Sequence, residues 1–474
     1  MLDFIIRGGQ TVTPWGIGVW DVAVQGERIV AVCEPGTLTD DVGRVIDATG
    51  KIVMPGGIEP HAHIAAPIAG HPDEETAPPP DVSKAALFGG TTTLIDFAIQ
   101  HPQIDIFQSI EERTSRWSRQ SYADYSHHCM LLGDIPARAI SQVKEAITAG
   151  YPSFKIFTTN IRPQVPDNER RLVSMGHLSA VMNEVASNGG IMAIHSEDDD
   201  IVQYMYKKFA AEERSEHYNL HLVHSNMSED ISFRRVLKLA EWTGAAVYFV
   251  HVSAKEGVNA ISEARAQGMP IYGETLHNYV SFNSEDYKRP DGMKYHTYPS
   301  LKSEEDRLRL WDGLFRGDLS TIATDEYCTT FRMKLLGKSL FDVTGGHNGV
   351  ETRVGIAFSE GVSKRGMSLQ RFVEITSSNA AKIMGLYPRK GTLSPGSDAD
   401  IVLIDPKINK RLTMEDFHIS DYSIWDGWEV QGWPVFTMLH GKVMVEEGNF
   451  LGRLGDGQFI PRKISANILA RPAC

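Results

Sequence analysis

The sequence predicts an α/β protein built on a (β/α)8 TIM-like barrel, with a small β-sandwich domain formed by both ends of the chain. Two observations predict the barrel. Short apolar runs alternate with helix-like stretches through the middle of the chain, and several of these runs end in a residue that can bind a metal. A third observation predicts the β domain, because turn-rich strands with alternating apolar residues occur near both chain ends.

The β domain is predicted from strand-like stretches that Gly and Asp residues interrupt. FIIRGGQTVT and DVAVQGERIVAV are examples from the first fifty residues. GTLSPGSDADIVLIDP, near the other end, shows the same pattern of apolar residues interrupted by Gly and Asp. Two such regions at opposite ends of one chain suggest a single domain assembled from both. The expected division is a discontinuous β-sandwich of residues 1–54 and 389–453, a catalytic barrel of residues 55–388, and a tail of residues 454–474 that contacts a neighbouring subunit.

The barrel is predicted from alternating strand-like and helix-like stretches. The apolar runs read as buried strands, and the stretches between several of them have apolar residues at helical spacing and mostly end in glycine. The runs are GGTTTLIDFA, SFKIFTT, GIMAIHSE, AAVYFVHVS, MPIYGETL and LSTIATDEY. The helical stretches are ARAISQVKEAITAG, HLSAVMNEVASNGG, ISFRRVLKLAEWTG and GVNAISEARAQG. An open doubly wound sheet is the competing fold, although no GxGxxG or P-loop motif supports a nucleotide site.

Composition excludes several classes of partner. The chain has 47 Lys and Arg against 60 Asp and Glu, and a formal charge of -13 argues against a nucleic acid or an anionic membrane as partner. No apolar run approaches the length of a membrane span, and MLDFIIRGG is too short for a signal peptide. The four cysteines lie far apart without a CxxC pair, which favours a reducing cytoplasm over a disulfide framework or a thiolate zinc site.

Residues that bind metals recur where the apolar runs end. The stretch IVMPGGIEPHAHI places two imidazoles on one face of a strand, and later runs each contribute one further group. Taken singly, a histidine is more often hydrogen-bonded in a core, an aspartate caps a helix, and a lysine reaches water. Recurrence at the same point of successive units favours a metal site at the barrel mouth. The residues are His61, His63, Lys155, His195, His251 and Asp325.

Longer motifs resemble one family. PGGIEPHAHI, FGGTTTLIDF, HVSAKEG and TSSNAAKIMGLYPRKGTLSPGSDADIVLID resemble segments of the dihydropyrimidinase and hydantoinase branch of the amidohydrolase superfamily. The resemblance extends from about Met1 to Arg453. It implies a homo-oligomer, a tetramer or a dimer, that hydrolyses small cyclic amides, imides or ureides, and the composition adds the expectation of a soluble, cytoplasmic protein.

The resemblance also implies roles for the six residues. His61, His63, His195, His251 and Asp325 match the direct ligands of two divalent metal ions. Zinc is favoured, since the donors are imidazole and carboxylate, and Mn²⁺, Co²⁺ and Fe²⁺ are alternatives. Lys155 matches a lysine that reacts with CO2 to give a carbamate bridging both ions, an N6-carboxylysine. In that family a hydroxide between the ions attacks the substrate, and Asp325 matches the general base and acid.

Three departures from the family pattern lie where substrate is expected. Asn160 stands where most hydantoinases have a tyrosine that steadies the oxyanion, and Tyr298 stands where a serine usually binds the ring. DEYCTT, with Glu326 and Tyr327, replaces the usual residues after the catalytic aspartate. We therefore expect a retained reaction with an altered substrate. The expected substrate contacts are Asn160, Tyr298, whose hydroxyl would replace the missing one, and Asn348.

Other functions remain as alternatives. Allantoinase or another cyclic amidohydrolase shares the metal residues, whereas Ala65 stands where dihydroorotases usually carry an arginine. A metal-free scaffold related to dihydropyrimidinase is a different class, and retention of all six proposed ligands argues against it. A deaminase-type amidohydrolase usually has one metal and no bridging lysine, so a carbamate at Lys155 would argue against that assignment.

Overall fold

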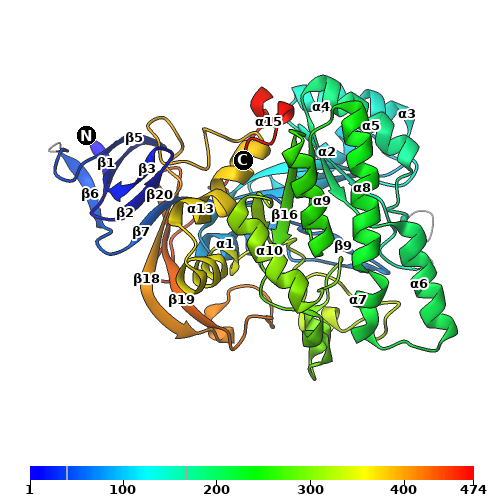
Figure 1. Cartoon of the computed structure of the whole chain (residues 1–474). Coiled ribbons are helices and arrows are strands. Elements are labelled where there is room, and N and C mark those ends of the chain that lie inside the picture. Colours follow the sequence, from blue (N-terminus) through cyan, green and yellow to red (C-terminus); the bar gives the residue numbers. More distant parts are fainter. Residues whose placement is uncertain (39–40, 164, 166–168) are drawn as a thin grey trace.

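Eight parallel strands form the central sheet of the computed structural model, which describes residues 1–38, 41–163, 165 and 169–474 (Figure 1). Their order is β17-β16-β15-β14-β13-β12-β11-β8. Past the two edge strands, the Glu326 N–H donates to the His61 carbonyl and the His63 N–H donates to the Glu326 carbonyl, which joins the edges. The predicted barrel is therefore confirmed. The strands are β8 (Gly57–Glu59), β11 (Thr91–Gln100), β12 (Asp124–Leu131), β13 (Ser153–Phe157), β14 (Ile191–His195), β15 (Val247–Phe249), β16 (Ile271–Leu276) and β17 (Thr321–Ala323).

Strand β12 is the barrel strand that sequence analysis does not predict. Its sequence, DYSHHCML, is interrupted by polar residues, yet the whole strand is buried. The interior accepts His128 because both ring nitrogens have partners: Nδ1 lies 2.7 Å from the Ser153 hydroxyl and Nε2 lies 2.8 Å from the Pro60 carbonyl. A buried polar strand of this kind depends on partners that are remote in sequence, so an apolar-run criterion overlooks it.

Helices surround the barrel (Figure 1). The long ones are α1 (Pro79–Phe88), α2 (Ile106–Trp117), α5 (Met175–Asn188), α6 (Asp199–Ala211), α8 (Asn226–Thr243), α9 (Lys255–Ala266) and α10 (Glu304–Arg316). Helices α5, α8 and α10 each begin after a serine cap and end at a left-handed glycine, as local sequence favours. None of the helices in the described ranges is both long and apolar enough to cross a membrane.

The helix predicted over residues 137–150 is divided into α3 (Ala137–Ser141) and α4 (Val143–Thr148). The division falls at Gln142, whose N–H donates to Ala139, three residues back rather than four. The Gln142 side chain also accepts a hydrogen bond from the Ile106 N–H. The remaining short helices are α7 (Leu220–Val223), α11 (Phe331–Lys334), α12 (Arg353–Ala357), α13 (Leu369–Val373), α14 (Asn379–Ile383) and α15 (Ala466–Ala470).

Strands from both chain ends share one sheet beside the barrel (Figure 1). Strand β7 pairs antiparallel with β18 and parallel with β2. The order is β21-β20-β19-β18-β7-β2-β3, with β2 (Gln10–Thr13), β3 (Gly16–Val19), β7 (Ile52–Pro55), β18 (Ile401–Arg411), β19 (Glu429–Leu439), β20 (Lys442–Glu446) and β21 (Asn449–Phe450). A second sheet, β5-β4-β1-β6, comprises β1 (Leu2–Arg7), β4 (Asp21–Gln25), β5 (Arg28–Cys33) and β6 (Val42–Asp47). Buried residues of both sheets, such as Val22 and Leu403, belong to one apolar cluster.

A buried ion cluster ties this β region to the barrel. The Lys390 ammonium contacts Asp124 at the start of β12, lies 3.0 Å from Asp398 and 2.6 Å from Asp400, and is buried with all three carboxylates. His440 joins the cluster through a 2.7 Å contact with Asp124. Because removing one member leaves uncompensated charges in the interior, the cluster is sensitive to substitution.

We expect Lys390→Met to lower the free energy of unfolding by about 3–5 kcal/mol, the usual effect of breaking a buried ion pair. The matched control is Lys407→Met, because Lys407 is exposed on β18, and we expect it to change stability by less than about 0.5 kcal/mol. Urea unfolding followed by circular dichroism measures both. Equal unfolding midpoints for the two variants would contradict a structural role for the cluster.

The tail of residues 454–474 packs against the chain's own barrel at the end opposite the candidate site. Ile460, Ile464 and Ile468 belong to an apolar cluster with Ile191 at the start of β14. The buried Arg462 donates to the hydroxyls of Ser126 and Ser153 and to the Met384 carbonyl. The tail therefore covers the ends of the barrel strands that lie away from the cavity described below.

Candidate active site

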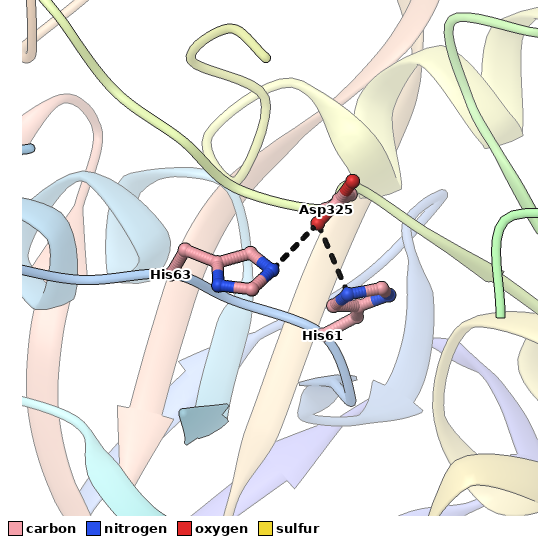
Figure 2. A group of neighbouring side chains, drawn as sticks. All are labelled: His61, His63 and Asp325. Carbon is pink, nitrogen blue, oxygen red and sulfur yellow. Dashed lines mark ion pairs between the residues drawn. The ribbon is translucent and has the colours of Figure 1, made fainter. Parts of the chain in front are cut away.

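Two histidines and an aspartate meet where the first and last barrel strands end (Figure 2). His61 and His63 follow β8, and their Nε2 atoms lie 3.0 Å and 3.1 Å from Asp325 Oδ1. Asp325 follows β17 and has a φ of 50°, a left-handed conformation that is unusual for a residue other than glycine. Donor atoms of all three residues lie within 4.8 Å of one another, a spacing that suits a metal ion.

The three remaining predicted residues line the same cavity of about 380 Å³. The ring of His251 lies 5.4 Å from that of His61 and 4.5 Å from that of His195, measured between centroids. Lys155, in the middle of β13, is fully buried, and its Nζ lies 5.0 Å from the centre of the Phe157 ring. The structure therefore brings all six sequence-predicted residues together.

Burial sets the protonation of this group. It lowers the pKa of Lys155 to about 7, although Asp325 and Glu274 act in the opposite direction. It also lowers the pKa of His63 and that of His195 to about 4, which favours the neutral imidazoles that bind metals. The exception is His61: burial disfavours its charge, but Asp325 and Glu274 raise its pKa to about 9.

The donor set fits divalent metal ions. Among the described residues, Lys155 Nζ is a buried polar atom without a hydrogen-bond partner, and the buried atoms His61 Nε2 and Asp325 Oδ1 have only the ion-pair contacts within this group. Buried polar atoms are ordinarily paired, so unpaired ones that line one cavity indicate a missing partner. Imidazole nitrogens with a carboxylate are ligands that zinc, cobalt, manganese and iron accept.

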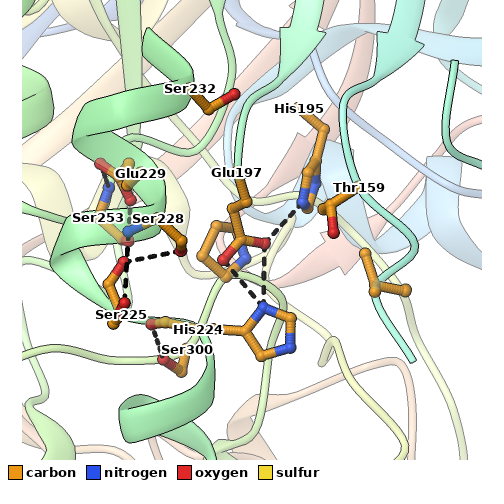
Figure 3. Close-up of polar contacts among 12 residues, drawn as sticks. Thr159, His195, Glu197, His224, Ser225, Ser228, Glu229, Ser232, Ser253 and Ser300 are labelled. Atoms are coloured by element: carbon orange, nitrogen blue, oxygen red, sulfur yellow. Dashed lines mark hydrogen bonds and ion pairs between the residues drawn. The ribbon is translucent and has the colours of Figure 1, made fainter. Parts of the chain in front are cut away.

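Two buried glutamates that sequence analysis misses orient the histidines. Glu274 on β16 accepts from His61 Nδ1 at 2.7 Å and from the His251 N–H at 3.0 Å. Glu197 lies 2.9 Å from His195 Nε2 and 2.9 Å from His224 Nδ1 (Figure 3). Metal-binding histidines usually donate their second ring N–H to a carboxylate. The available signals were a glutamate within the buried run IYGETL and another two residues after His195.

Two of the three residues predicted to contact the substrate lie at the cavity. Asn160 and Tyr298 line the cavity. Asn160 Oδ1 accepts from the main-chain N–H groups of Arg171 and Leu172, at 2.9 Å and 3.0 Å. The Tyr298 hydroxyl donates to the Val343 carbonyl at 3.0 Å, so its proton is already engaged.

Asn348 lies outside the described cavity lining. Its side-chain amide donates to the carbonyls of Ile419, at 3.2 Å, and Tyr422, at 2.9 Å. The structure therefore uses this residue to hold a neighbouring loop and does not bring it into the cavity.

The residues after Asp325 have separate roles. The Glu326 carboxylate is buried and accepts from the N–H groups of Gly349 and Val350, so it fixes the chain behind the site. Tyr327 lines the cavity, and its hydroxyl donates to the Pro67 carbonyl at 3.0 Å. Of the two residues that depart from the family pattern here, Tyr327 therefore forms part of the cavity wall, and Glu326 is a buried residue that holds the chain behind it.

The cavity rim comes from three segments that are distant in sequence. They are residues 66–70, which contain β9 (Pro67–Ile68) and lead into β10 (His71–Glu75), residues 160–171, and residues 344–346. In the second segment, residues 164 and 166–168 lie outside the described part of the chain. Arg162 clamps the rim by donating to the carbonyls of Ala69, Asp342 and Val343.

Several known proteins are similar to this chain in both sequence and fold. The model of the Amidohydrolase family matches residues 52–444. A D-hydantoinase of Geobacillus stearothermophilus is 32% identical over 465 residues, covering 97% of this chain and 96% of the relative. An L-hydantoinase of Paenarthrobacter aurescens is 29% identical over 465 residues, covering 98% and 99%. The crystal structure of a dihydropyrimidinase from Brevibacillus agri NCHU1002 aligns with a TM-score of 0.92 at 31% identity, covering 98% of this chain and 100% of that one.

Proposed function

Because the chain belongs to the amidohydrolase family, we propose that it is a metal-dependent hydrolase that opens the ring of a small cyclic amide, ureide or imide. The observation that carries this proposal is the convergence of His61, His63, Lys155, His195, His251 and Asp325 on one cavity. Similarity to both D- and L-hydantoinases supports the reaction class and leaves the stereochemical preference open to measurement.

We propose that these six residues hold two divalent ions, with zinc favoured over manganese, cobalt and iron. When bound, such ions acidify water and polarise a carbonyl group. Lys155 would be carboxylated: its neutral amine adds to CO2, forms a C–N bond and releases one proton. The Lys155 side chain is completely buried and has no described hydrogen-bond partner, which supports this modification. Carboxylation would replace an unfavourable buried cation by an anion.

Asp325 is proposed to move the proton. Its carboxylate would take a proton from the attacking water and deliver it to the departing amide nitrogen, so that the same group serves as base and then as acid. Glu274 and Glu197 would fix the rings of His61 and His195 through their second nitrogens. Asn160 and Tyr298 line the cavity and are proposed to contact the substrate; Tyr298 would release the Val343 carbonyl to do so.

We also propose how the chain is divided into domains and where the enzyme acts. Residues 1–54 and 389–453 would form one domain that supports the catalytic barrel of residues 55–388, and the shared sheet supports this division. The enzyme would act as a homo-oligomer in the cytoplasm. Four cysteines without a disulfide support a reducing compartment.

The deciding experiment is a substrate screen of purified protein supplied with zinc and bicarbonate. Hydantoins, dihydrouracil, allantoin, cyclic imides and lactams would be tested for ring opening, with metal content measured on the same sample. We expect about two zinc ions per chain, the number the six ligands are proposed to hold, and hydrolysis of at least one of these ring classes. A chain that binds no metal and opens no ring would instead be a scaffold.

We expect Glu197→Gln to weaken zinc binding about 10- to 100-fold, because the substitution removes the anion that orients His195. Zinc loss to a chelator, followed by metal analysis, measures this independently of turnover. Glu212→Gln, at an exposed position at the end of α6, is the matched control and should lose zinc like the wild type. Wild-type zinc retention by Glu197→Gln would contradict the assigned role.

A further inference from the structure

The cavity contains two guanidinium groups, and they differ in what they bind. Arg162 donates to three main-chain carbonyls of the rim, so its hydrogen-bonding capacity is largely used within the chain. Arg171 also lines the cavity, but no described side chain or carbonyl accepts a hydrogen bond from its guanidinium. No described carboxylate forms an ion pair with it.

The main chain of Arg171 is held rigidly beside the candidate catalytic groups. Asn160 Oδ1 accepts from its N–H, Leu172 pairs with Phe157, and the Val173 N–H donates to the Phe157 carbonyl at 2.9 Å. The guanidinium carbon lies 5.3 Å from the centre of the Phe157 ring, a cation–π contact. That ring stacks on His195 with 4.8 Å between centroids. The Phe157 ring therefore lies between the Arg171 guanidinium and His195, a proposed metal ligand.

This arrangement requires a counter-charge. A cation that is partly removed from water and lacks an anionic partner is unfavourable, and proposed divalent ions nearby would make the cavity still more positive. Guanidinium groups are the usual partners of carboxylates, which they bind through two parallel hydrogen bonds. The apolar walls formed by Ile99, Met130 and Leu132 provide no anion, and the Asp325 carboxylate in the same cavity attracts Arg171 without forming an ion pair with it. Glu169 lines the cavity but is exposed and forms no ion pair with Arg171.

We propose that the natural substrate is a cyclic amide or ureide that carries a carboxylate substituent, and that Arg171 binds this carboxylate. The inference rests on the proposed ring-opening function and names its substrate class. The inference also assigns a role to Asn160, which stands where the family has a tyrosine. Its side chain accepts a hydrogen bond from the Arg171 N–H and so positions the arginine that would bind the carboxylate. Arg171 thereby becomes a specificity-determining residue.

The test uses substrates that differ only in charge. Hydantoin-5-acetic acid and hydantoin-5-acetamide have nearly the same shape, so their ratio of kcat/KM isolates the contribution of the carboxylate. For the wild type we expect the acid to be preferred about 100-fold, in line with a close charge pair in a shielded site. In Arg171→Met the preference should fall to within about threefold, and Arg171→Lys should retain part of it because charge remains without the planar fork.

Arg170→Met is the matched control. Arg170 is the adjacent residue, is 38% exposed, lies 4.0 Å from Asp134 and is not among the cavity-lining residues. We expect this variant to keep the wild-type ratio. The wild-type ratio itself does not depend on any variant folding correctly.

A binding measurement separates failure of this inference from failure of the proposed reaction. Calorimetry with orotate and orotamide, which are planar analogues that resist ring opening, reports recognition of the carboxylate without turnover. Tighter binding of orotate, lost in Arg171→Met, supports the inference. Ring opening of the amide with no preference for the acid overturns the inference and leaves the proposed reaction intact. If orotate binds no more tightly than orotamide, and the hydantoin acid is not preferred over its amide, the inference about Arg171 is wrong. If no ring compound is opened at all, the proposed reaction is wrong.

Discussion

Lys155→Met is expected to abolish ring opening and to release the bound zinc while leaving the protein folded. The substitution removes the amine that would carry the carbamate, and methionine fills the same buried position on β13. Loss of metal assistance is expected to lower kcat/KM by roughly 10⁴-fold or more, because such ions contribute several kcal/mol to transition-state stabilisation. Compared in the metal-free state, stability should stay equal or rise, since a buried amine without a described partner is replaced by an apolar group.

Metal analysis, urea unfolding and steady-state kinetics measure the three effects. Lys144→Met, at an exposed position of α4, is the matched control and should behave as the wild type. After exchange into ¹³C-bicarbonate, the wild type should show a protein-bound carbamate signal that Lys155→Met lacks. A Lys155→Met variant that retains two zinc ions and hydrolyses its substrate would exclude the lysine as a bridging ligand.

Asp325→Asn is expected to lower kcat by about 10²- to 10⁴-fold, the usual contribution of a positioned general base. The amide keeps the size of the carboxylate but cannot accept and return a proton at this position. Because Asp325 Oδ1 lies near both His61 and His63, we also expect weaker zinc binding, so kinetics must be measured at saturating zinc. The effect should then appear mainly in kcat rather than in KM.

Asp230→Asn is the control for this substitution, because Asp230 forms an ion pair with Arg234 on α8 and is not among the residues that line the cavity. It should leave both constants unchanged. A metal-replete Asp325→Asn enzyme with kcat within threefold of the wild type would assign the proton transfer to another group.

The barrel and most of its six convergent residues are predictable from local sequence, because both follow from strand periodicity; Lys155, in the middle of β13, is the exception. Parallel strands place their ends at one mouth, so a residue such as His195 at the end of a buried run is located without any knowledge of its neighbours. The prediction that His61 and His63 lie on a strand is less accurate: β8 ends at Glu59, and both residues lie in the segment just beyond it. Their convergence on Asp325 nevertheless holds.

The supporting residues could not be located in the same way, because their roles depend on contacts between distant segments. The role of Glu274 follows only from the folded barrel, in which its side chain contacts the ring of His61, 213 residues earlier. Asn160 could be recognised as a departure from the family pattern, but its hydrogen bonds to Arg171 and Leu172 could not. The left-handed backbone at Asp325 and His251 is also set by the surrounding fold rather than by residue type.

The pairing of β7 with β18 has a consequence for how the chain is made. Strand β7 ends at Pro55, and its antiparallel partner begins at Ile401, so the intervening barrel segment is synthesised before the shared sheet can be completed. Until then β7 presents an open edge that invites pairing with other chains. We therefore expect nascent chains to be open to misassembly while the barrel is translated, and a barrel that folds quickly to shorten that interval.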